Sequence, residues 1–159
     1  MFDLDAKDCA ILNELQADGR ATNVDLATRV HLSPSACLRR VRLLEDNGVI
    51  AGYTMLVDPV AVGVPSNVFA EITLVSQKQA ELDRFEEAVR AVPEVMECYL
   101  VTGEYDYLLR VVARDTVDYE RIHHEHLTKL PGVARVKSSF TLRTVAKKTA
   151  LPLRRPVTM

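Results

Sequence analysis

The chain has 159 residues, enough for one ordinary domain or two small ones. Apolar residues make up 48% and charged residues 26%, a composition typical of globular proteins. No apolar run approaches membrane-spanning length, and the N-terminal residues lack the pattern of a signal peptide. The three cysteines stand far apart, which argues against disulfides or a zinc site and favours reduced thiols in a cytoplasm. The net charge of −2 does not by itself indicate nucleic-acid binding.

A three-helix pattern occupies the first fifty residues. The first helix is predicted over residues 4–18, with Asp3 as its cap, and the second from Thr22 or Asn23 through Val30. The turn to the third helix is short and holds His31 where a glycine in the left-handed conformation is common. Two helices joined by so short a turn are typical of the helix-turn-helix motif of DNA-binding proteins.

The third predicted helix carries residue types that suit a DNA groove. Ser33 can cap it and Pro34 suits its first position. Short polar residues followed by arginines suit base edges and phosphates. An arginine-rich helix can equally be a solvated surface, so the helix alone leaves both interpretations open. The inward residues are predicted to be Leu38, Val41 and Leu44, and the outward ones Ser35, Arg39 and Arg42, with Arg40 beside them.

Residues 49–57 are apolar and β-favouring with Gly52 among them, which predicts a small hairpin, the wing of a winged helix. Tyr53 is expected to pack on the third helix. Two prolines and a glycine then indicate a linker. The chain therefore divides into a DNA-binding domain (1–57), a linker (58–66), a second domain (67–147) and a tail (148–159).

The second domain has the order β-α-β-β-α-β. Strands are predicted at 67–75, 95–101, 106–112 and 133–145, and helices at 79–92 and 116–130. This order is that of a ferredoxin-like α+β fold, a four-stranded antiparallel sheet with both helices on one face. The uncovered face, expected to hold Phe69, Tyr99, Val101 and Val111, predicts a homodimer. A dimer supplies the two DNA-reading heads that a palindromic site requires.

The turn at residues 102–106 is the candidate ligand site. Gly103 lets backbone amides approach a ligand closely, and amides can bind a carboxylate. The carboxylate of Asp106 can accept hydrogen bonds from an α-amino group. An ordinary hairpin turn stabilised by Asp106 is the alternative.

Two other clusters were weighed. Glu120, His123 and His126 lie on one helical stretch, but no second cluster completes a metal site, so neither a metal nor another cofactor is expected. The pairs Lys147-Lys148 and Arg154-Arg155 suggest contact with wrapped DNA or, more simply, a solvated tail. No nucleophile motif or phosphate loop indicates an enzyme. A ferredoxin-like enzyme and a stand-alone amino-acid-binding oligomer are the alternatives, and the enzyme leaves residues 1–60 unexplained.

Six strings of residues are together specific, although any one alone would be weak. They are LDAKDCAIL at 4–12, LQADGR at 15–20, LSPSACLRRVRLLE at 32–45, GVIAGY at 48–53, ECYLVTGEYDYLL at 97–109 and LPGV at 130–133. These strings resemble the Lrp/AsnC family of transcriptional regulators over nearly the whole chain, and within it the leucine-responsive branch. Ala36 stands where a second proline is common in that branch, and Arg39 where an acid is common. For this reason no operator sequence is carried over.

The resemblance implies a winged helix-turn-helix domain followed by a ferredoxin-like domain of the RAM type. It implies a bacterial, cytoplasmic and nucleoid-associated regulator of amino-acid metabolism genes, without enzyme activity, that binds a pseudo-palindromic double-stranded operator. Dimers of such proteins often assemble into octamers, and an amino-acid effector, leucine or another, binds between C-terminal domains. The DNA-binding residues are expected to be Asn23, Ser33, Ser35, Ala36, Arg39, Arg40 and Arg42. The effector-binding residues are expected to be Thr102, Gly103, Glu104, Tyr105, Asp106, Ser139 and Thr141.

Overall fold

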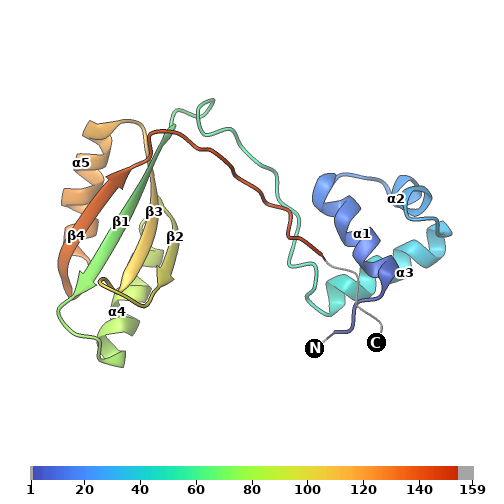
Figure 1. The fold of residues 1–159 in the computed structure, drawn as a ribbon, viewed down its shortest axis with the longest axis horizontal. Helices are drawn as coiled ribbons and strands as arrows, with labels where there is room; N and C mark the ends of the chain where they lie inside the picture. Colours follow the sequence, from blue (N-terminus) through green and yellow to red (C-terminus); the bar gives the residue numbers. More distant parts are fainter. Residues whose placement is uncertain (1, 154–159) are drawn as a thin grey trace. The chain divides into compact units, whose positions relative to one another are not determined.

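The structure is a computed structural model that describes residues 2–153. The chain divides into two compact units, drawn in Figure 1. The head domain contains the residues up to Leu56 together with those from Ala146 onward, and the sheet domain contains Val57–Val145. The pair Arg154-Arg155 lies outside the described residues. No helix in the described part of the chain is long and apolar enough to cross a membrane.

The head domain consists of α1 (Ala6–Ala17), α2 (Asn23–Arg29) and α3 (Pro34–Asp46), so all three predicted helices are confirmed. Each helix begins where a side chain accepts a hydrogen bond from a backbone N–H of its first turn. The caps of α2 and α3 are Thr22 and Ser33. The cap of α1 is Asp5 and not the predicted Asp3, because Asp5 and Asp8 form a reciprocal capping box.

The turn between α2 and α3 has the backbone conformation expected from the sequence. His31 adopts φ 55°, and it is the only non-glycine residue with positive φ among the described residues. The core of the head domain is small, and its buried members are Ile11, Leu12, Leu26, Ala27, Val30, Cys37 and Leu44.

One residue of α3 was assigned to the wrong face. The buried stripe runs through Cys37, Val41 and Leu44, at spacings of four and three residues. Leu38 lies next to this stripe and is 39% exposed, so its predicted place in the core is wrong. The spacing of 38, 41 and 44 is as helical as that of 37, 41 and 44, and only contact with α1 and α2 decides between them.

The predicted hairpin at residues 49–57 does not form. This described segment contains no strand, and it runs on from α3 as extended chain. Its first apolar residues, Val49 and Ile50, pack against the core of the head domain. Tyr53 donates a hydrogen bond to the carboxylate of Glu45 at 2.9 Å, so it does contact α3 as expected. A two-stranded hairpin is marginal by itself, and the later apolar residues Met55, Leu56 and Val57 are left 82%, 73% and 53% exposed.

The sheet domain has the predicted β-α-β-β-α-β order. Its strands are β1 (Ser66–Leu74), β2 (Val95–Leu100), β3 (Tyr107–Ala113) and β4 (Val133–Phe140). They form one antiparallel sheet in the order β2-β3-β1-β4. The helices are α4 (Gln79–Arg90) and α5 (Thr116–Glu125), followed by the short 3₁₀ helix η1 (Leu127–Lys129).

The last strand is shorter than predicted. It ends at Phe140, which pairs with Val68 near the start of β1. Beyond that point the N–H of Thr141 still donates to the carbonyl of Asn67, and the pairing then stops. The apolar residues Leu142 and Val145 follow the end of this strand and are 99% and 84% exposed.

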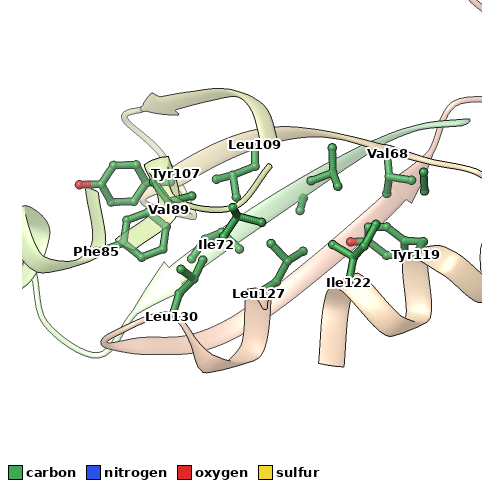
Figure 2. Close-up of a cluster of buried hydrophobic side chains, with 14 of the residues drawn as sticks. Val68, Ile72, Phe85, Val89, Tyr107, Leu109, Tyr119, Ile122, Leu127 and Leu130 are labelled. Carbon is green, nitrogen blue, oxygen red and sulfur yellow. The ribbon is translucent and has the colours of Figure 1, made fainter. Parts of the chain in front are cut away.

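The core of the sheet domain lies between the sheet and its two helices (Figure 2). Alternate residues of β1 and β3 point into this core. The rings of Phe85 and Tyr107 pack together there, with 4.5 Å between their centroids. Val111 is fully buried here, so its predicted place on the uncovered face is wrong. Phe69 and Tyr99 are 38% and 53% exposed, as expected of the uncovered face, and Val101 lies beyond the end of β2.

Candidate functional site

The exposed face of α3 carries two of the three predicted arginines. A shallow depression of about 340 Å³ is lined by Ser35, Leu38, Arg39, Arg42, Leu43 and Asp46. Within the described part of the chain, neither Arg39 nor Arg42 has an ion-pair partner. Two cationic side chains are thus available to an anionic ligand on one face of a helix-turn-helix.

Arg40 is occupied within the head domain. Its guanidinium donates to the carboxylates of Asp5 and Asp8, both at 2.7 Å, and its side chain is only 25% exposed. These hydrogen bonds raise the pKa of Arg40. The sequence suggested that Arg40 lies beside Arg39 and Arg42 on the exposed face. Its side chain instead points to Asp5 and Asp8. It ties α3 to the N-terminus of α1.

The remaining predicted DNA-binding residues surround the start of α3. The amide of Asn23 donates to the carbonyl of Pro34 at 2.8 Å, which links α2 to α3. The hydroxyl of Ser33 accepts from the N–H of Ala36 at 3.3 Å and lies 3.3 Å from that of Ser35. Asn23 and Ser33 thus fix where α3 begins, and Ser35 stands at the exposed edge.

The predicted ligand loop connects β2 to β3. Thr102, Gly103 and Glu104 are exposed, and Tyr105 is half-buried. Gly103 has φ 136°, a conformation that favours glycine. Among the described residues, no backbone N–H between Thr102 and Tyr105 has a hydrogen-bond partner. These amides are therefore free to donate to an acceptor group.

Asp106 anchors this loop. Its carboxylate is 6% exposed and accepts hydrogen bonds from the N–H of Leu74 at 2.7 Å and the amide of Gln77 at 2.6 Å. Its own N–H donates to the carbonyl of Ile72 at 2.8 Å. Both carboxylate oxygens of Asp106 thus accept hydrogen bonds from within the domain. This is the arrangement expected if Asp106 stabilises the turn and does not contact a ligand.

Ser139 and Thr141 are not brought to the loop within one chain. The loop lies at the end of β1 where Ile72 pairs with Tyr107 and Val136, whereas Ser139 pairs with Phe69. Val136 is the residue of β4 level with the loop, and Ser139 lies three residues further along β4, a distance of about 10 Å. Within one chain, Ser139 and the loop therefore lie at different levels of the sheet.

Sequence reasoning missed a cavity at the base of the loop. It has a volume of about 530 Å³ and lies between α4 and β2, with Glu86, Arg90, Cys98, Leu100 and Tyr107 among its lining residues. The Tyr107 hydroxyl donates to the carboxylate of Glu86 at 2.9 Å, and Arg90 lies 3.5 Å from that carboxylate. Burial and the charge of Glu86 raise the pKa of Cys98 to about 11. In the sequence, Glu86 and Arg90 have the spacing of an ordinary exposed ion pair on a helix. No local pattern therefore predicts this cavity.

The tail and the histidine cluster also have defined surroundings. The backbone of Leu151 exchanges two hydrogen bonds with the side chain of Gln16, at 2.6 and 3.2 Å, and Leu153 packs on the head core. This part of the tail is docked and not simply solvated, while Lys147 and Lys148 are exposed. Across the described residues, no group of three or more His, Cys, Asp or Glu side chains is placed to hold a metal ion.

The fold and these sites define a helix-turn-helix DNA-binding protein with a separate ligand-binding domain. Residues 4–51 match the winged helix-turn-helix DNA-binding family, and residues 67–151 match the Lrp/AsnC ligand binding domain. The leucine-responsive regulatory protein of Haemophilus influenzae is 41% identical over 151 residues, which cover 95% of this chain and 91% of that protein. Its Escherichia coli counterpart is 42% identical over 96% of this chain and 93% of its own length. The chain belongs to the Lrp/AsnC family of transcriptional regulators.

Solved structures agree with this assignment. A transcriptional regulator from Neisseria meningitidis in complex with L-methionine has a TM-score of 0.90 at 38% identity, over 94% of this chain and 97% of that one. An AsnC family regulator from Agrobacterium tumefaciens gives the same values. The chain is thus a transcriptional regulator with a DNA-binding and a ligand-binding domain, and not an enzyme.

Proposed function

We propose that the chain regulates genes of amino-acid metabolism by binding a pseudo-palindromic operator through the exposed face of α3. One observation carries the choice of residues: Arg39 and Arg42 are exposed without ion-pair partners in the described chain, while Arg40 is held by Asp5 and Asp8. Because α3 follows a helix-turn-helix turn, its exposed face is the one that enters the major groove. Arg39 and Arg42 contact phosphate or guanine, and Ser35 stands beside them.

The test is fluorescence anisotropy with a DNA duplex obtained by binding-site selection from a random library. Arg39→Ala and Arg42→Ala should each weaken binding and lower the salt dependence by about one ion. Arg84→Ala removes the same charge from α4 and is the matched control. If either head variant binds with the wild-type affinity and salt dependence, that arginine is not a DNA ligand.

We further propose that two copies associate through the uncovered face of the sheet. That face carries the exposed rings of Phe69 and Tyr99. Its central cation, Arg110, is already satisfied by Glu97 at 2.8 Å and Asn67 at 3.0 Å, so the face can be covered without leaving a bare charge. Phe69→Asp should shift the sedimentation coefficient to that of a smaller species. Leu142→Asp, at an exposed residue outside the sheet, should leave it unchanged.

The effector we propose is an apolar amino acid, bound by the sheet domain at the loop and the adjoining cavity. The Neisseria meningitidis relative was solved with L-methionine, which supports this class of ligand. Free amides of residues 102–105 suit an α-carboxylate, and Glu86 and Arg90 supply opposite charges beside apolar walls. Asp106 acts by holding the loop. Ser139 and Thr141 join from a neighbouring copy, and binding then shifts the equilibrium between assemblies.

Calorimetry with L-methionine and L-leucine tests this site. Arg90→Gln and Glu86→Gln should weaken the binding of at least one of the two, while Arg84→Gln, on the same helix outside the cavity, should not. Wild-type heats that survive both cavity variants would remove the cavity from the site. Heats that also survive Gly103→Val, which strains the loop, would remove the loop as well.

A further inference from the structure

Two leucines lie on the face of α3 that we assign to DNA. Leu38 is 39% exposed and Leu43 is 40% exposed, and both line the depression that also contains Arg39 and Arg42. A single exposed leucine on a protein surface needs no explanation. Apolar side chains that share a depression with two cations on a DNA-reading helix are different, because the surface they meet there carries both phosphates and bases.

The position of Leu38 along α3 places it among the base-reading residues. It follows Ser35 by three residues and precedes Arg42 by four, so the three side chains form one stripe along the helix. In helix-turn-helix proteins the N-terminal part of the recognition helix contacts the base edges. Leu38 lies in that part. Leu43 lies nearer the C-terminal end, beside Asp46, whose negative charge disfavours close approach to phosphates.

The chemistry of the major groove supplies one partner for an apolar side chain at this place. Thymine is the only base that presents a methyl group there, at C5, where cytosine has only a hydrogen. We propose that Leu38 forms a thymine-reading subsite, in which its side chain packs on the C5-methyl of one thymine in each half-site. The subsite rests on the function proposed above, because α3 must enter the major groove for Leu38 to reach a base.

Arg39 and Arg42 give this subsite its setting. They line the same depression as Leu38 and bring two positive charges that hold the helix against the DNA backbone, so the apolar contact does not have to supply the affinity by itself. Contacts to phosphate carry no sequence information, whereas the methyl contact discriminates thymine from cytosine. Leu38 therefore contributes mainly to sequence preference, and the arginines mainly to affinity.

Deoxyuridine in place of thymidine removes the methyl group and leaves base pairing intact. The probe is the duplex selected from a random library, synthesised with thymidine, deoxyuridine or 5-bromodeoxyuridine throughout. For the wild-type chain, deoxyuridine should weaken binding on the order of tenfold, about threefold for the methyl group of each half-site. Bromine is close to methyl in size, so 5-bromodeoxyuridine should restore most of the affinity.

The variants assign this effect to one side chain. Leu38→Ala should bind the thymidine duplex more weakly and lose most of the deoxyuridine effect, while Leu38→Met, which stays apolar, should retain it. Leu43→Ala removes the other exposed leucine and should keep the full effect. A wild-type chain that is indifferent to deoxyuridine would overturn the proposal, as would an effect that disappears in Leu43→Ala instead of Leu38→Ala. Failure to select any duplex would overturn the proposed DNA-binding function itself, which is a separate result.

Discussion

The head domain and the sheet domain differ in how much apolar core supports their polar links. Among the described residues, the core of the sheet domain contains fifteen buried apolar residues, whereas that of the head domain contains seven. Both domains hold polar links between segments far apart in the chain, from Arg40 to Asp5 and Asp8 and from Gln16 to Leu151 in the head domain, and from Asp106 to Leu74 and Gln77 in the sheet domain. A small core buries too little apolar surface to hold three helices firmly. The orientation of the DNA-reading helix therefore depends on polar groups that pH and single substitutions can disturb.

The largest expected effect lies in the apolar core of the sheet domain. Phe85 is fully buried against Tyr107, so Phe85→Ala should lower the free energy of unfolding of this domain by about 3–5 kcal/mol. Urea denaturation followed by hydrogen exchange of sheet-domain peptides measures it. Leu142→Ala, at a fully exposed residue, should change nothing measurable. Equal effects of the two substitutions would mean that the domain is not held by this core.

The next effect tests the polar links of the head domain. Arg40→Met keeps the length of the side chain but leaves the nearly buried carboxylate of Asp8 without its cation, which should cost about 1–3 kcal/mol. Exchange of α1 amides should accelerate, while exchange in the sheet domain stays the same. Arg42→Met is the control, because it removes an exposed arginine of the same helix. If both variants are equally stable, the ion pairs do not hold α3 to α1.

A smaller effect concerns the docked tail. Gln16→Ala removes both hydrogen bonds to the backbone of Leu151, at a cost of roughly 1 kcal/mol, because the bonds are exposed to water. The readout is the exchange rate of the Leu151 amide, which should rise toward that of an unprotected peptide. Asn13→Ala, at an exposed position on α1, serves as the control. A Leu151 amide that stays protected would show that Gln16 does not hold the tail.

The smallest expected effect is a difference in acid sensitivity. Although burial opposes it, hydrogen bonds from Asp8, Arg40 and Lys7 hold the pKa of Asp5 below its usual value of 3.8. A folded-state pKa below the unfolded one gives stability that is complete above pH 3.8 and lost as the pH falls below it. Asp5→Asn can still cap α1 but no longer titrates, so the head domain should lose less stability between pH 5 and pH 3.

The control for this measurement lies in the other domain. The N–H of Arg114 and the guanidinium of Arg121 hold the pKa of Asp118 low as well. Asp118→Asn should therefore change the acid sensitivity of sheet-domain peptides and leave that of the head domain alone. A change in the wrong domain would show that the two units do not respond to acid separately.

The sequence predicted the three head helices and the order of elements in the sheet domain because their signals are local, whereas the predicted hairpin at 49–57 and the predicted end of the last strand were wrong. Ser33, Thr22 and the spacing of apolar residues lie within a few positions of the structure they specify. The buried face of each element was harder to predict, and the predictions for Leu38 and Val111 were wrong. Alternation and helical spacing show which residues share a face, but the packing partner decides which face is buried. The ion pairs of Arg40 could not be foreseen, because its partners, Asp5 and Asp8, lie at the N-terminus of α1, more than thirty positions away; its role in DNA binding stays a prediction.

The ligand loop shows the same limit. Its glycine and its hairpin position could be recognised from the string TGEYD, and the resemblance to a family added the expectation of a ligand. The engagement of Asp106 by Leu74 and Gln77 spans about thirty positions, and no local pattern reports it. The cavity beside Glu86 and Cys98 likewise combines a helix with two strands, so it exists only in the folded domain.

The return of the tail to the head domain makes the sheet domain an insertion within it. Because residues from Ala146 onward belong with the residues before Val57, the chain enters the sheet domain once and leaves it once. A protease that cuts only in the segment 51–65 would separate the three head helices covalently from the sheet domain, and only the non-covalent docking of the tail through Leu151 and Leu153 would hold the two pieces together. An isolated head domain that ends near residue 57 would lack Leu151 and Leu153, and a synthetic peptide spanning them should restore its missing contacts in trans.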